Sequence, residues 1–344
     1  MAKQNLSTEP YKGVRDFYPE DMAVQNYIFS TWKKVCEEFH YQEYAASLLE
    51  PAELYRSKGS DEIVNEQMFT FTDRGDREVA LRPEMTPSLA RMVAAQRKSL
   101  KFPLRWFTIA NCFRYERPQR GRKREHWQLN ADVMGIAGVE AEVEIISLAH
   151  AIMKKFGAKD EDFEIRINNR QLINYLIYDI FLNNRDDTWK KKWGPYLSRA
   201  IDRKDKIENE KFHEEVKTVL HDKTDSFLNL LGSKDVSDVK NALDKSEITG
   251  KYTESLEKLL PTLKNLQICN IRFDLTLMRG FDYYTGMVFE VFDTNPENRR
   301  ALFGGGRYDN LLEMFGVEPV PTVGFGMGDV TIRDFLETHG LRTK

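Results

Sequence analysis

Residues 113–132, FRYERPQRGRKREHWQLNAD, constrain the fold of this chain more than any other stretch. The centre, residues 117–124, holds five basic residues and no acidic one, and Pro118 and Gly121 prevent a regular helix there. Residues 105–113 before it are rich in aromatic and β-branched side chains, and residues 127–136 after it resume an apolar pattern. We therefore predict two antiparallel strands joined by a mobile basic loop.

The two predicted strands present polar side chains at even spacing. Side chains two residues apart point the same way, so Arg114 shares a face with Glu116, and Gln128 shares one with Asp132. The guanidinium group of arginine matches phosphate, and a basic loop can close over a polyphosphate tail. The simplest predicted ligand is a nucleoside triphosphate, with which Mg²⁺ could arrive. The alternative is a charged hairpin that only faces solvent.

Length and composition set broad limits on the protein. With 344 residues, the chain suits two domains or one domain with an insertion, and its net charge of -3 gives no global attraction to nucleic acid or membrane. The absence of a long apolar run predicts a soluble cytoplasmic protein without a membrane span. Cys36, Cys112 and Cys269 are scattered among apolar residues, which favours reduced thiols in the core. No paired histidine or cysteine spacing predicts a structural metal site.

Apolar periodicity predicts the other elements. A stripe of apolar residues predicts a helix over residues 21–39, and a short strand over residues 44–49 should end at Pro51. Residues 68–72 and 79–81 flank a turn and predict a β-hairpin. Further predicted helices cover residues 139–156, 172–182 and 329–337, and further predicted strands cover residues 163–167, 268–276, 287–292 and 319–327.

The composition changes in the middle of the chain. Charges become nearly balanced and a helical pattern persists to about residue 263, so we predict a mainly helical inserted domain over residues 169–269. It would divide a catalytic domain made of residues 1–168 and 270–344. Lys190, Lys191 and Lys192 lie between two tryptophans, where they either contact an RNA backbone or form a solvated helix face, the second being favoured.

Two short segments carry candidate binding residues. In LRPEMT, Glu84 and Thr86 lie at a strand-to-helix junction, where they either present a carboxylate and a hydroxyl to an ammonium group or cap the helix through Thr86. In RGFDYYTG, Arg279 precedes two tyrosines at a bend. This arginine is either aimed at a reacting phosphate or carboxylate, or paired with Asp282.

Two glycine-rich segments near the C-terminus predict close ligand approach. Residues 304–309, GGGRYD, are expected to open a helix through residue 314 and to place main-chain amides against an anion. Gly324, Gly326 and Gly328 fall on one face of a predicted strand. They would leave a flat surface for a planar ring.

Together these segments resemble the catalytic core of histidyl-tRNA synthetases, which are class II aminoacyl-tRNA synthetases. The resemblance covers KGVRDFYP, residues 41–51, LRPEMT, FRYERPQRGRKREHWQ, RGFDYYTG and GGGRYD, of which RGFDYYTG is the most specific. It implies an α+β fold in which helices flank an antiparallel sheet. It also implies ATP with Mg²⁺, histidine and tRNA(His) as ligands, and a homodimer formed around Pro51.

The resemblance also assigns roles to residues of this chain. Arg114 would hold the α-phosphate and the histidine carboxylate, while Glu116 would meet the adenine and Arg122 the outer phosphates. Arg279 would stabilise charge that builds on the α-phosphate. The expected catalytic residues are thus Arg114, Gln128 and Arg279. The expected histidine-binding residues are Glu84, Thr86 and Gln128 for the ammonium group, Asp132 and Tyr284 for the imidazole, and also Tyr283 and Arg279.

The chain departs from the family pattern at several positions. Thr331 stands where an arginine normally clamps the ATP tail, and Arg333 lies too far around the helix to replace it. His126 replaces a more usual aromatic residue. Family members continue from about Gly340 into an anticodon-binding domain, which we expect to be absent here. Two alternatives stay open: a histidine-sensing regulatory subunit of ATP phosphoribosyltransferase, and an enzyme that adenylates histidine for another acceptor.

Overall fold

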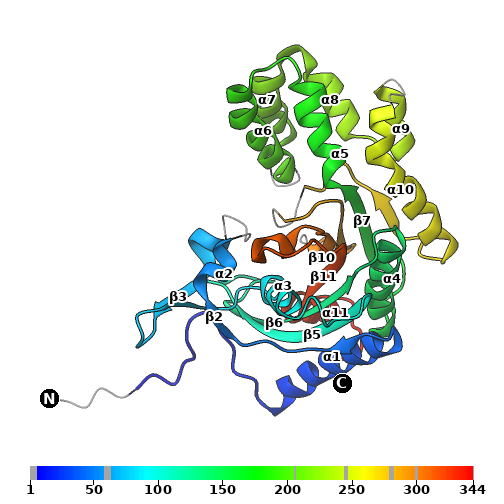
Figure 1. Ribbon diagram of the computed structural model, residues 1–344. Helices are drawn as coiled ribbons and strands as arrows, with labels where there is room; N and C mark the ends of the chain where they lie inside the picture. The colour runs from blue at the N-terminus through cyan, green and yellow to red at the C-terminus, as the bar shows by residue number, and fades with distance from the viewer. Residues whose placement is uncertain are drawn as a thin grey trace.

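The computed structural model describes residues 6–57, 63–204, 207–243, 247–278, 283–298 and 301–343. They form a large sheet with the strand order β1-β5-β6-β11-β10-β9-β7-β8 (Figure 1). The central strands pair antiparallel, whereas β1 and β8 pair parallel to their neighbours at the edges. This confirms the predicted α+β class. The strands are Gln42–Glu43 (β1), Leu104–Phe113 (β5), Glu125–Met134 (β6), Phe163–Asn169 (β7), Ile271–Phe273 (β8), Met287–Asp293 (β9), Ala301–Arg307 (β10) and Thr322–Gly328 (β11).

Helices α1 (Pro19–Glu38), α4 (Glu140–Lys155) and α11 (Asp329–Thr338) pack together against one face of the sheet. The predicted apolar stripe of α1 is buried, and the indole of Trp32 donates a hydrogen bond of 3.0 Å to the Met327 sulfur on β11. The odd-numbered side chains of β6, Leu129, Ala131 and Val133, enter the same core. Strand alternation therefore leaves the even-numbered side chains of β6 on the opposite face, where the candidate site lies.

A smaller sheet lies beside the large one and contains β2 (Leu49–Pro51), β4 (Glu78–Leu81) and β3 (Phe69–Thr72). It confirms the predicted hairpin. The strand predicted over residues 44–49 is wrong, because the observed strand begins only at Leu49. The guanidinium of buried Arg82 explains the difference, since it donates to the carbonyls of Ala46 (2.8 Å) and Asn111 (2.7 Å). The Ala46 carbonyl bonds to this side chain in place of a main-chain amide of a neighbouring strand.

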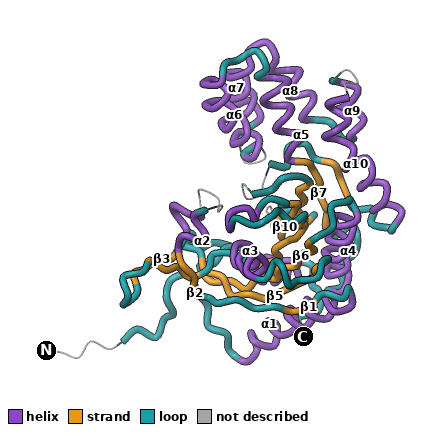
Figure 2. The backbone as a smooth tube through the Cα atoms, viewed as in Figure 1, coloured by secondary structure: helices purple, strands orange, loops and turns teal. Residues whose placement is uncertain are grey.

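The described elements between β7 and β8 are all helical, as predicted (Figure 2). They are α5 (Arg170–Tyr175), α6 (Asp187–Asp202), α7 (Asn209–Leu220), α8 (Thr224–Leu231), α9 (Val236–Ala242), α10 (Glu247–Asn265), the π-helix η2 (Leu176–Phe181) and the 3₁₀ helix η4 (His221–Lys223). We refer to residues 170–265 as the helical segment. The proposed division into domains at residues 168 and 270 stays a prediction. No helix in the described ranges has both the length and the apolar composition needed to cross a membrane.

Two local predictions are wrong. The glycines at 304–306 lie inside β10 and not at a helix start, and the helix that follows is a short 3₁₀ helix, η5 (Leu311–Phe315). A Cβ on Gly305 would lie 2.1 Å from the carbonyl oxygen of Gly324, so this glycine permits close approach of β10 and β11. Cys269 is exposed, because its neighbour Ile268 occupies the core position. Cys36 and Cys112 are buried, as expected.

Candidate active site

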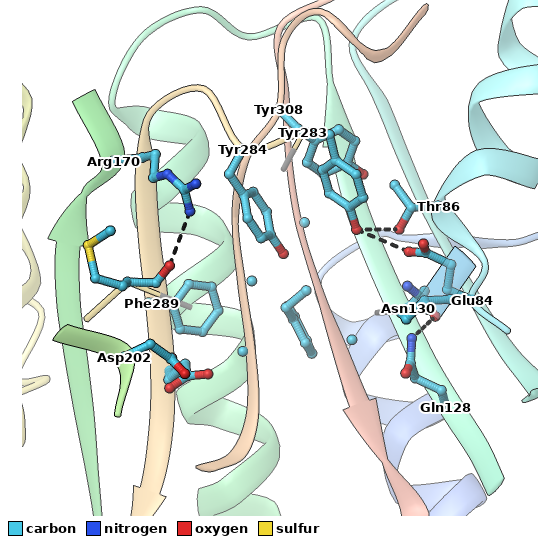
Figure 3. A pocket seen from close by; sticks show the side chains of 18 of the residues that line it. Glu84, Thr86, Gln128, Asn130, Arg170, Asp202, Tyr283, Tyr284, Phe289 and Tyr308 are labelled. Atoms are coloured by element: carbon cyan, nitrogen blue, oxygen red, sulfur yellow. Dashed lines mark hydrogen bonds between the residues drawn. The ribbon is translucent and has the colours of Figure 1, made fainter. Parts of the chain in front are cut away.

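A cavity of about 850 Å³ lies over the open face of the sheet (Figure 3). Apart from Arg279, which lies outside the described residues, it brings together every site residue predicted from the sequence. These are Glu84, Thr86, Arg114, Glu116, Arg122, Gln128, Asp132, Tyr283 and Tyr284. They come from chain segments as far apart as α3 (Thr86–Ala95), β6 and the residues just before β9. The fold thus gathers the predicted residues into one site.

Glycines of β11 form part of the cavity floor. A Cβ on Gly324 would lie 1.9 Å from Asp132 Oδ1, and one on Gly326 would lie 2.6 Å from Gln128 Nε2. The missing side chains therefore leave space for Asp132 and Gln128 to extend across the neighbouring strand. Both glycines line the cavity, but Gly328 does not, because it is the N-terminal capping residue of α11. The predicted glycine surface is shorter than expected.

Glu84 presents a buried carboxyl group to one end of the cavity. Its Oε2 accepts a hydrogen bond of 3.2 Å from the Tyr283 hydroxyl, which also lies 3.5 Å from Thr86 Oγ1. Its Oε1 is buried and has no hydrogen-bond partner in the described residues. Burial raises the pKa of Glu84 to about 7, although the charge of Arg114 and the Tyr283 hydrogen bond oppose the rise. An unpartnered carboxylate oxygen here can bind an ammonium group.

The capping alternative for Thr86 is wrong. Met85 occupies the N-cap position of α3, and Thr86 is the first helical residue, without a capping hydrogen bond from either side chain. Pro87 at the second helical position has no main-chain N–H, so no capping acceptor is needed there. The Thr86 hydroxyl is therefore available to the cavity.

The buried Glu84 carboxyl predicts a specific pH effect on stability. Its pKa rises from 4.5 to about 7 on folding, so the folded state favours its neutral form. The contribution to stability is complete below pH 4.5 and is lost as pH rises through 7, a change of about 3 kcal/mol. Glu84→Gln, which still accepts from Tyr283, should remove this loss. Denaturant unfolding of both proteins at several pH values measures the free energy of unfolding. If this free energy depends on pH in the same way in both proteins, the prediction is wrong.

Asp132 presents a second buried carboxyl group, on β6. Its Oδ1 accepts a short hydrogen bond from the Tyr308 hydroxyl, whereas its Oδ2 is buried and has no hydrogen-bond partner in the described residues. Burial raises the pKa of Asp132 to about 7, and the Tyr308 hydrogen bond opposes the rise. The free oxygen can accept from an N–H group of a ligand. The ring of Tyr284 lies nearby, 6.3 Å from that of Tyr308 between ring centroids.

Tyr308 and Asn130 line the cavity but were not predicted from the sequence. The resemblance implies that the GGGRYD segment belongs to the histidine pocket, but the sequence did not single out Tyr308 within it. Asn130 could have been found from strand alternation, since it lies between Gln128 and Asp132 on the same face and accepts a 2.8 Å hydrogen bond from Gln128 Nε2.

Arg114 and the basic loop form the cationic side of the site. The sequence placed Arg114 and Glu116 on a strand, but β5 ends at Phe113 and both residues follow it. The Nε of Arg114 donates to the Pro83 carbonyl (2.8 Å), and Arg122 Nη1 lies 3.1 Å from Glu116 Oε2. No other hydrogen bond fixes the Arg114 guanidinium within the described ranges, so its terminal nitrogens remain as donors for an anion.

The basic loop packs against the rest of the protein at both ends. The main-chain amide of Arg124 donates to the Gly13 carbonyl (2.7 Å), and its guanidinium lies 3.9 Å from the ring centroid of Tyr115. At the tip, Arg120 Nη2 donates to Thr338 Oγ1 on α11 (3.1 Å). These contacts position Arg122 at the cavity.

Thr331, Arg333 and His126, the residues that depart from the family pattern, each have defined surroundings. Thr331 Oγ1 donates to the Leu302 carbonyl (2.6 Å), and Arg333 pairs with Asp21 and Glu337, each at 2.9 Å. Arg333 therefore does not supply a cation to the cavity. His126 has its pKa lowered to about 3 by burial and by the charges of Arg114 and Arg15, so its ring is neutral.

The helical segment forms one wall of the cavity, which the sequence did not predict. Its contributions are Arg170, Asn174, Tyr178, Pro195, Ser198, Arg199 and Asp202. In Figure 3, Arg170 and Asp202 lie on the side away from Glu84, Thr86 and Gln128. Among the described residues, no group of three or more histidine, cysteine, aspartate or glutamate side chains is placed to hold a metal ion.

Comparison with known proteins agrees with this site. The family model for histidyl-tRNA synthetase matches residues 13–330. A histidine--tRNA ligase of Leptospira biflexa is 44% identical over 99% of this chain and 77% of its own length, and one of Thermoplasma volcanium is 37% identical over 98% and 76%. A solved Bacillus halodurans protein, titled as an ATP phosphoribosyltransferase regulatory subunit/histidyl-tRNA synthetase, aligns with TM-score 0.81 and 27% identity over 96% of this chain and 84% of its own. The chain belongs to the histidyl-tRNA synthetase family.

Proposed function

We propose that this chain joins histidine to ATP, forming histidyl-adenylate and pyrophosphate, and then transfers histidine to the 3′ end of tRNA(His). The observation that carries this proposal is the pair of buried carboxyl groups in one cavity. Glu84 and Asp132 each keep one oxygen without a partner in the described residues. Two separated acceptors suit a ligand with an ammonium group at one end and an N–H ring at the other, as histidine has.

The proposed histidine subsite uses both ends of the cavity. Glu84, Thr86 and Gln128 would bind the ammonium group, with Tyr283 holding Glu84 in place through its hydroxyl. Asp132 would accept from one imidazole nitrogen, and Tyr284 would meet the other. A site whose buried polar groups need both partners discriminates strongly against amino acids that lack them.

The proposed nucleotide subsite lies under the basic loop. Glu116 would meet the adenine edge and Arg122 the outer phosphates, while Arg114 would contact the α-phosphate and the histidine carboxylate. ATP would enter as its Mg²⁺ complex, and the ion would neutralise part of the charge on the phosphates.

In the proposed reaction, a histidine carboxylate oxygen attacks the α-phosphorus, and the bond to the β-phosphate oxygen breaks to release pyrophosphate. Arg114 and, by resemblance, Arg279 would stabilise the charge that develops on the α-phosphate. Gln128 would help to hold the attacking amino acid in line with the breaking bond.

A non-catalytic histidine sensor is the second candidate, because the Bacillus halodurans title names a regulatory subunit as well as a synthetase. The enzyme is favoured, since curated relatives 35–44% identical over most of the chain are named histidine--tRNA ligases. Arg114 and Arg122 in the cavity also support it, because binding of histidine alone does not require cations for a polyphosphate.

Charging of tRNA(His) with labelled histidine tests the proposal. We expect acid-precipitable histidine that depends on ATP and on this tRNA. Adenylate formation without transfer would instead indicate another acceptor, and histidine binding without adenylate would indicate a sensor.

We also propose that the protein acts in the cytoplasm as a homodimer through the region around Pro51. Apolar side chains are exposed there: Leu48, Leu49 (44% exposed) and Phe71 (49%). Leu49→Asp is expected to convert the dimer to a monomer, because it places a charge in an apolar contact. Light scattering measures the mass. Leu266→Asp, at another exposed leucine on the loop after α10, is the control. Equal masses for both variants would contradict the proposed interface.

A further inference from the structure

Helix α6 presents two different faces. Leu197, Ala200 and Ile201 are buried among the other helices. Pro195, Ser198, Arg199 and Asp202 follow the spacing of a second face and line the cavity over the sheet. The helical segment therefore contributes a polar wall to the site.

Arg199 differs from the other cavity cations because its guanidinium has no partner among the described residues. Arg122 lies 3.1 Å from Glu116, Arg170 donates to the Met278 carbonyl at 3.1 Å, and Arg114 donates to the Pro83 carbonyl. In the part of the chain that the structure describes, the Arg199 guanidinium has no hydrogen bond or ion pair; only its main-chain carbonyl is used, by Arg203. Arg199 is exposed and lines the cavity, so within the described residues the five donors of its side chain remain available to a ligand.

The position of Arg199 indicates the kind of group it would meet. It lines the cavity one turn before Asp202 on α6, and Asp202 lies on the side away from Glu84, Thr86 and Gln128 (Figure 3). The carboxyl groups that suit an ammonium group or a ring N–H are on other walls. A planar, permanently charged guanidinium matches an anionic group such as phosphate.

We propose that Arg199 of the helical segment binds a phosphate group of the substrates. The inference rests on the proposed function for the identity of those substrates. Phosphate can come from the outer phosphates of ATP and pyrophosphate or from the 3′-terminal backbone of the tRNA. In either case α6 is part of the active site, and its placement affects catalysis directly.

Arg203, the C-cap residue of α6, supplies a matched control. It is one turn away and carries the same charge, but it pairs with Glu215 on α7 at 3.0 Å and does not line the cavity. Arg199→Gln and Arg203→Gln therefore cause the same change in net charge. Arg199→Lys keeps the charge without the planar group.

The test compares equilibrium binding of pyrophosphate and of tRNA(His) by the full chain and these variants. We expect Arg199→Gln to lower the affinity for one of the two ligands about tenfold or more. Arg203→Gln should change neither affinity by more than about twofold. The affinity of Arg199→Lys should lie between those of these two variants. Weaker pyrophosphate binding identifies the ATP phosphates. Weaker tRNA binding alone, with a shallower salt dependence, identifies the RNA backbone.

Equal affinities of Arg199→Gln and Arg203→Gln for both ligands would overturn the inference. Histidine affinity should be the same in every variant, which separates a local effect from general loss of structure. Because these are binding measurements, they remain informative if the wild-type chain binds pyrophosphate but forms no adenylate, a result that would reject the proposed function and not the role of Arg199.

Discussion

Arg114→Ala is expected to lower kcat/KM for histidine-dependent adenylation about 10²- to 10³-fold, because Arg114 is the donor that we propose for the reacting phosphate. The Nε of Arg114 is held by the Pro83 carbonyl, so the guanidinium is positioned before a ligand binds. The loss should appear in exchange of pyrophosphate into ATP measured at saturating histidine.

The same substitution has a second expected effect. The charge of Arg114 opposes the rise in the pKa of Glu84, so its removal should move the pH dependence of histidine binding to higher pH. Arg117→Ala serves as the control, since Arg117 is an exposed residue of the same segment that does not line the cavity. Equal rates for Arg114→Ala and Arg117→Ala would contradict the proposed role.

Asp132→Asn is expected to raise the KM for histidine about 100-fold. Asparagine can still accept from Tyr308 through one oxygen, but its amide would then point a donor at the position where Oδ2 now points an acceptor. A ligand N–H that meets a buried donor leaves both groups unsatisfied, at a cost of about 3 kcal/mol.

Direct measurement of histidine binding without ATP checks this expectation, because it separates recognition of the ring from chemistry. Asp132→Glu keeps a carboxylate acceptor and should lose less affinity than Asp132→Asn. If Asp132→Asn binds histidine as tightly as the wild type, Asp132 does not recognise the imidazole.

The elements that the sequence predicted well are those whose pattern is local. The apolar stripe on α1 and the alternation along β5 and β6 each indicate which face is buried. These three elements and the antiparallel pairing of β5 with β6 were confirmed. Where side chains from elsewhere replace regular pairing, prediction failed. The segment after Tyr44 is interrupted by contacts of Arg82, a residue more than thirty positions away in the chain.

The composition of the site was largely predictable, but its internal contacts were not. Glu84, Gln128 and Asp132 were found from residue type, spacing and family resemblance. The hydrogen bond that Tyr308 gives to Asp132 joins residues 176 positions apart. The wall formed by α6 likewise depends on how the helical segment folds back over the sheet. Neither arrangement leaves a periodic signal in the sequence.

The most direct test of the account is pyrophosphate exchange into ATP by this chain, with histidine and without tRNA. The account predicts exchange that requires histidine and that other amino acids do not support, because Glu84 is proposed to bind the ammonium group and Asp132 the ring N–H of histidine. Histidine binding without exchange would contradict it, and would mean that this cavity senses histidine and does not activate it.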